Sequence, residues 1–133
     1  MIVIDANILI YSLIDGPKTT LVRSLREKDG DWRTTGLCMH EILNVLTTYE
    51  RQKVLSLAKC KKLLEHAERF LHVAECEVKM SEALAVAAKY TITGYDAQYV
   101  ALAKMFDVPL ITEDRKLREA VPGIALSMAE YLG

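Results

Sequence analysis

Met1-Ile-Val-Ile-Asp5-Ala-Asn7 is the stretch that decides the fold of this chain. The apolar run from Ile2 to Ile4 is too short for a helix, so it predicts a strand buried on both faces, as in a parallel sheet. A helix is expected from Asn7 to about Ile14, with Asn7 as its N-cap. Ligands of open α/β sheets bind outside the carboxyl ends of the strands. We therefore expect Asp5 at a binding edge of the sheet.

The rest of the chain alternates between strand and helix patterns, with no internal repeat and no linker. Such alternation predicts an α/β fold, a three-layer α/β/α sandwich around a five-stranded parallel sheet. Residues 1–133 are expected to form a single domain. Further strands are predicted at 32–35, 72–74, 108–112 and 123–126. Helices are predicted at 17–30, 39–52, 57–71, 81–89, 95–106 and 114–120, with a last one after the capping-box residue Ser127.

Composition narrows the class of protein. Hydrophobic residues make up 51% of 133 residues, enough for a core, and the formal net charge of −1 gives no global attraction for nucleic acid. Three widely spaced cysteines, Cys38, Cys60 and Cys76, favour free thiols in a reducing compartment. No apolar run approaches the ~20 residues of a membrane span. These features predict a cytoplasmic protein that does not cross a membrane.

Four carboxylates are expected at one edge of the predicted sheet. Asp5 ends the first strand, and Glu41 lies in the predicted first turn of the helix after the second strand. Asp96 lies in the first turn of the helix that leads into the fourth strand, and Asp114 follows that strand by two residues. Helix amino ends and strand carboxyl ends meet at the same edge in right-handed crossovers. The four side chains should therefore converge.

Each acid also has a purely structural explanation. Asp114 suits an N-cap, Glu41 and Asp96 suit the positive end of a helix dipole, and Asp5 suits a turn. As a group, however, four carboxylates raise one another's pKa unless a cation neutralises them. Oxygen ligands favour a hard ion, Mg²⁺ or Mn²⁺. Such an ion and the carboxylates can activate water and stabilise the leaving oxygen of a phosphodiester.

Neutral and basic residues near these acids complete the predicted site. Asn7 could orient Asp5 or a water, and Thr112 could hydrogen-bond an acid or a phosphate; each is equally well explained as a cap. Phosphate binding needs local positive charge, and the candidates Arg115, Lys116 and Arg118 directly follow Asp114. A second basic patch, at Lys59, Lys61 and Lys62, is better explained as a solvated helix face.

Four segments of the chain together resemble the PIN-domain ribonucleases, in particular the toxins of VapBC toxin–antitoxin pairs. The segments run from Ile2 to Asn7, from His40 to Asn44, from Tyr95 to Ala103 and from Leu110 to Leu117. The resemblance implies a five-stranded parallel sheet and RNA cleavage that depends on Mg²⁺ or Mn²⁺. It places the family's acids at Asp5, Glu41, Asp96 and Asp114. It further implies a homodimer and a small cognate antitoxin. Ala6 departs from the pattern, since many relatives have a hydroxyl residue there.

Two other interpretations agree with parts of the sequence. A haloacid-dehalogenase-like phosphatase also begins with a strand that ends in aspartate, but it needs a second aspartate where this chain has Asn7. A PIN scaffold used only for RNA binding or assembly would be expected to lack some of the acids, and all four are present. Metal-dependent phosphate release from a phosphomonoester would favour the phosphatase, and RNA binding without cleavage would favour the scaffold.

Overall fold

The computed structural model describes residues 1–133 and has an α/β fold with eight helices and five strands. The strands are short: β1 (Ile2–Ile4), β2 (Trp32–Thr35), β3 (Glu75–Cys76), β4 (Leu110–Ile111) and β5 (Ala125–Leu126). The helices are α1 (Ala6–Leu13), α2 (Thr19–Lys28), α3 (Leu37–Arg51), α4 (Leu57–Ala74), α5 (Met80–Tyr90), α6 (Gly94–Phe106), α7 (Arg115–Ala120) and α8 (Met128–Leu132).

All strand pairs are parallel, and the strand order is β3-β2-β1-β4-β5. This arrangement confirms the predicted five-stranded parallel sheet. β1 lies at its centre, paired with β2 on one side and β4 on the other. Ile2, Val3 and Ile4 are completely buried, as expected of a strand covered on both faces. Asp5 therefore emerges at the middle of the carboxyl edge.

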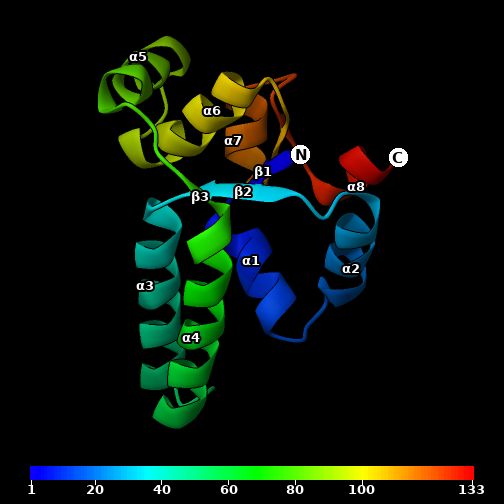
Figure 1. The fold of residues 1–133 in the computed structure, drawn as a ribbon, viewed down its shortest axis with the longest axis vertical. Helices are drawn as coiled ribbons and strands as arrows, with labels where there is room; N and C mark the ends of the chain where they lie inside the picture. Colours follow the sequence, from blue (N-terminus) through cyan, green and yellow to red (C-terminus); the bar gives the residue numbers. More distant parts are fainter.

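Helices cover both faces of the sheet (Figure 1). α5, α6 and α7 lie on one face, and α1 with α2, α3 and α4 lies on the other. α3 and α4 pack as an antiparallel pair and extend beyond the body of the domain (Figure 1). The amino ends of α3 and α6 lie at the carboxyl edge of the sheet, where Asp5 ends β1. None of the helices is long and apolar enough to cross a bilayer.

The predicted third strand at 72–74 is wrong. α4 continues through Ala74, because Leu71 and Ala74 extend its buried stripe, and β3 begins only at Glu75. The residues predicted as a strand belong to the last turn of α4, where His72 and Val73 are both exposed. As an edge strand, β3 needs only two residues to pair with β2.

Two helix starts differ from the prediction. Asp5, not Asn7, is the N-cap of α1, because its extended backbone lets its carboxylate accept a hydrogen bond from Ile8 N. Asn7 is an exposed residue in the first turn of that helix. α3 begins at Leu37, directly after Gly36, so Glu41 lies in its second turn rather than its first. The predicted caps at Asp114 and Ser127 are confirmed, and Ser56 caps α4.

Candidate active site

Asp5 is the buried centre of the candidate site. Only 8% of its surface is exposed, and its Oδ1 accepts a hydrogen bond of 3.2 Å from Ile8 N. Burial raises the pKa of Asp5 from 3.8 to about 6, and the nearby charges of Glu41 and Asp96 contribute to the rise. Hydrogen bonds from Thr112 and Ile8 offset part of this effect. The chain thus holds a carboxyl group where its ionised form is disfavoured.

Thr112 connects two of the acids. Its hydroxyl donates a 2.5 Å hydrogen bond to Asp5 Oδ2 and accepts one of 3.1 Å from Asp114 N. The side chain is completely buried at the end of β4, next to the end of β1. The structure therefore shows both the predicted hydrogen bond to an acid and the backbone bond of a strand-end cap at Thr112.

Glu41 is held by a tyrosine from the opposite face of the sheet. Tyr99 on α6 is 1% exposed, and its hydroxyl donates a hydrogen bond to Glu41 Oε1. Burial raises the pKa of Tyr99, so the hydroxyl remains a donor at neutral pH. Burial also raises the pKa of Glu41; the bond from Tyr99 lowers it in part, and the charge of Asp96 raises it further. Glu41 Oε2 remains available as an acceptor.

Asp96 is the acid that interacts electrostatically with all of the others. It lies in the first turn of α6, where its backbone amide donates to the capping residue Thr93. Burial raises its pKa, and the charge of Asp114 raises it further. Asp114 itself is exposed and caps α7: its Oδ1 accepts a hydrogen bond of 3.1 Å from Leu117 N. Asp96 is thus electrostatically coupled to each of the other three acids.

No internal cation neutralises this group. The five ion pairs of the structure involve none of Asp5, Glu41, Asp96 and Asp114. No three His, Cys, Asp or Glu side chains form a ready cage for a metal ion. The donor set nevertheless fits Mg²⁺ or Mn²⁺, because Mg²⁺ keeps several waters and is bound by one or two carboxylates together with substrate phosphates. The unneutralised, partly buried carboxylates are the observation that supports this fit.

The predicted basic residues lie in different environments on α7. Arg115 pairs with Glu119 at 3.0 Å, and Arg118 Nη1 pairs with Glu130 of α8 at 2.8 Å. Arg118 is the less accessible of the two, and its Nε is buried without a partner. Lys116 is exposed and has no acidic partner, so it is the freest cation beside Asp114. Lys59, Lys61 and Lys62 lie exposed on α4, in the helix pair that leaves the body.

Tyr99 is the site residue that sequence reasoning left without a role. It follows Asp96 by three residues, which places both side chains on one face of α6. A buried tyrosine usually finds a hydrogen-bond partner, and this rule was the only available signal. The sequence alone could not identify Glu41 as that partner, because the two residues are 58 positions apart.

The chain is similar in sequence and in fold to known PIN-domain and VapC proteins. The family model described as PIN domain matches residues 2–121. The chain is 28% identical over 126 residues to Ribonuclease VapC3 of Pyrobaculum aerophilum, which covers 92% of this chain and 96% of the relative. The crystal structure of PAE2754 from the same organism superposes with a TM-score of 0.73 at 20% identity, over 98% of this chain and 85% of that one. A chain of a toxin–antitoxin complex from Klebsiella pneumoniae superposes with a TM-score of 0.64 at 18% identity, over 96% and 98%.

Proposed function

Since the chain belongs to the PIN domain family, we propose that it is a metal-dependent endoribonuclease that acts as the toxin of a toxin–antitoxin pair. The observation that carries the proposal is the group of four carboxylates around buried Asp5, coupled to one another and paired with no cation. Its relative from Pyrobaculum aerophilum bears the name Ribonuclease VapC3, which supports RNA as the substrate.

The proposed cofactor is Mg²⁺ or Mn²⁺, held by Asp5, Glu41, Asp96 and Asp114. When bound, such an ion lowers the pKa of water and stabilises charge on phosphate oxygens. Asp5 is fixed by Ile8 N and Thr112, and Glu41 is fixed by Tyr99, so two acids are already oriented. In the hydrolysis, a water oxygen would bond to phosphorus while the ester P–O bond breaks; the leaving oxygen would take a proton from solvent, to which the proton lost by the attacking water finally returns. Glu41 Oε2 is the proposed acceptor for the proton that the attacking water loses.

A small antitoxin is the proposed partner. The name of the VapC relative and the toxin–antitoxin complex among the similar structures support it. An arginine or lysine of the partner would pair with the carboxylate group and compete with the metal. The homodimer implied by the family resemblance stays a prediction, which light scattering of the purified protein would test.

The test of this function is cleavage of single-stranded RNA by the purified protein with Mg²⁺ or Mn²⁺. Activity should disappear in EDTA and in the Asp5→Asn and Asp96→Asn variants. Glu68→Gln is the matched control, because Glu68 is exposed on α4 and belongs to no site. Cleavage in chelator by metal-free protein would refute metal dependence. Binding of RNA without cleavage would instead identify a PIN scaffold.

A growth assay tests the toxin role separately. Expression of the wild-type protein should arrest growth, and Asp5→Asn should be harmless. Co-expression of the small protein encoded beside it should restore growth. Normal growth with abundant wild-type protein, in a host without the partner, would argue against the toxin role while leaving the nuclease chemistry untouched.

A further inference from the structure

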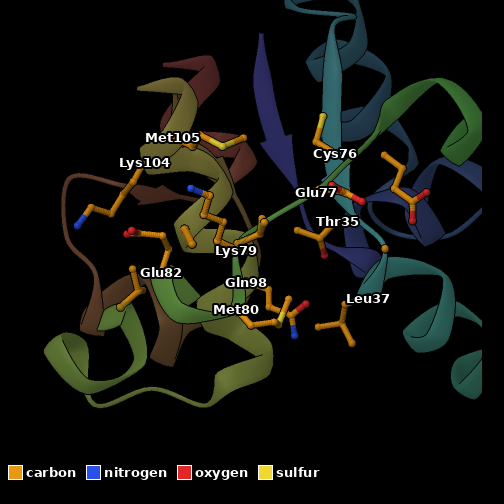
Figure 2. A pocket seen from close by; sticks show the side chains of 15 residues that line it. Thr35, Leu37, Cys76, Glu77, Lys79, Met80, Glu82, Gln98, Lys104 and Met105 are labelled. Atoms are coloured by element: carbon orange, nitrogen blue, oxygen red, sulfur yellow. The ribbon is translucent and has the colours of Figure 1, made fainter. Parts of the chain in front are cut away.

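A cavity of about 1050 Å³ opens at the same edge of the sheet as the four acids, although none of the four lines it. Its walls come from the end of β2, the start of α3, β3 with the loop that follows, α5 and α6 (Figure 2). Leu37 lines the cavity and lies one turn before Glu41 on the same face of α3. Gln98 lines it from α6, the helix whose first turn holds Asp96. The cavity and the acids therefore share two helices and one sheet edge.

Thr35 gives this cavity an unused polar group. Its side chain lines the cavity and is 2% exposed, yet its hydroxyl has no hydrogen-bond partner. Its neighbour Thr34 is equally buried but donates to Ile4 O at 2.8 Å. Buried polar groups without a hydrogen-bond partner are rare in folded proteins, so the unpaired hydroxyl of Thr35 needs a structural or functional reason. A ligand that reaches the end of β2 would provide the missing partner.

The rest of the lining suits a flat, uncharged, polar-edged ligand. Leu37, Met80 and Met105 supply apolar surface, and the thioethers favour contact with an aromatic ring. Gln98 supplies an amide that both donates and accepts; Figure 2 shows it grouped with Leu37 and Met80. Three glutamates line the cavity against two lysines, which disfavours a phosphate inside it. The acids are Glu75, Glu77 and Glu82, and the bases are Lys79 and Lys104.

We propose that this cavity receives a nucleobase of single-stranded RNA next to the scissile phosphate, which rests on the ribonuclease function proposed above. Gln98 hydrogen-bonds the edge of the base, Leu37 and Met80 contact its faces, and Thr35 pairs with a further polar atom. Sequence-specific RNA recognition commonly uses unstacked bases that are inserted in this way. The cavity thus selects the nucleotide at which the RNA is cut.

The first test maps cleavage of a randomised single-stranded RNA pool by sequencing. Wild-type protein should prefer one base beside the cut, and Gln98→Ala should reduce that preference by about tenfold, the usual effect of losing a bidentate base contact. Gln52→Ala is the control, because Gln52 is exposed at the far end of α3. Unchanged preference in Gln98→Ala would overturn the proposal, as would an equal loss in the control.

The second test does not depend on cleavage. The Asp5→Asn protein, labelled with ¹⁵N, is titrated with adenosine, guanosine, cytidine, uridine and, separately, inorganic phosphate. One nucleoside should shift the Gln98 side-chain amide, and phosphate should not. Thr35→Val should weaken the binding of that nucleoside without lowering the melting temperature of the protein, since the Thr35 hydroxyl has no hydrogen-bond partner in the free protein. No shift at Gln98, or a shift caused by phosphate, would refute the base site.

The two tests separate the two proposals. Nucleoside binding at Gln98 by a protein that never cleaves RNA would retain the base site and refute the nuclease. Metal-dependent RNA cleavage would retain the nuclease. It would refute the base site if Gln98→Ala kept the wild-type base preference and no nucleoside shifted the Gln98 amide signal.

Discussion

The hydroxyl of Thr112 donates a 2.5 Å hydrogen bond to Asp5 Oδ2, joining the ends of β4 and β1 at the centre of the sheet edge. The hydroxyl oxygen of Thr112 also accepts a hydrogen bond from Asp114 N, so this one small side chain fixes the relative positions of two acids. It also lowers the pKa of Asp5, against the effect of burial. Thr112 is therefore a positioning residue for the proposed metal site.

Thr112→Val should raise the pKa of Asp5 further and reduce RNA cleavage by about 10- to 100-fold, the usual loss when a group that orients a metal ligand is removed. A ¹³C carboxyl titration by NMR reports the pKa, and initial rates at saturating Mn²⁺ report the activity. Thr112→Ser keeps the hydroxyl and should restore both values. A valine variant with wild-type pKa and rate would exclude this role.

Asp5 should make the metal-free protein less stable at neutral pH. Its pKa is raised to about 6 in the folded protein, so the unfolded chain ionises first as pH rises from about 4. The contribution of Asp5 to stability is therefore most favourable below pH 4 and declines until the group is ionised in both states above pH 6. The full difference corresponds to about 3 kcal/mol, at ~1.4 kcal/mol for each pH unit between the two pKa values.

Asp5→Asn removes this titration; its amide oxygen can accept the bond from Ile8 N, and its NH2 group can donate to the Thr112 hydroxyl, which donates in the wild type. The variant should melt several degrees above wild type at pH 7 in EDTA, and the gain should shrink towards zero near pH 4. Thermal unfolding at both pH values measures it, with Glu68→Gln as an exposed control. An equal gain at both pH values would show that charge burial is not its cause.

Tyr99→Phe should weaken metal binding while leaving the fold intact. Without the hydrogen bond to Glu41 Oε1, the carboxylate loses its fixed orientation and its pKa rises. We expect Mn²⁺ affinity, measured by calorimetry, to fall by about 10- to 100-fold, with partial recovery of RNA cleavage at high metal concentration. Tyr95→Phe is the control, since Tyr95 is exposed on the same helix. Equal affinities for wild type and Tyr99→Phe would limit Tyr99 to packing.

Much of this site could be predicted from the sequence, because β1 and the acid after it follow from local pattern alone. Parallel topology then brought Asp5, Glu41, Asp96 and Asp114 to one edge. The bond from Tyr99 to Glu41 could not be predicted, because it joins two helices on opposite faces of the sheet. The start of β3 was missed since an edge strand of two residues carries almost no periodic signal. The cavity beside α5 also depends on tertiary packing.

Lys116 should contribute more to RNA binding than Arg118, although both follow Asp114. Arg118 is paired with Glu130 at 2.8 Å and links α7 to α8, whereas Lys116 is exposed without an acidic partner. Lys116→Gln should lower RNA affinity and reduce the slope of log affinity against log salt by about 1, the value for one lost phosphate contact. Arg118→Gln should mainly lower the melting temperature.

Fluorescence anisotropy in an Asp5→Asn background measures RNA binding without cleavage. Lys59→Gln is the control, because Lys59 is an exposed lysine in the first turn of α4, on a different helix from Asp114 and Lys116. A salt slope reduced by Arg118→Gln but not by Lys116→Gln would reverse this assignment and place the phosphate path over the α7–α8 junction.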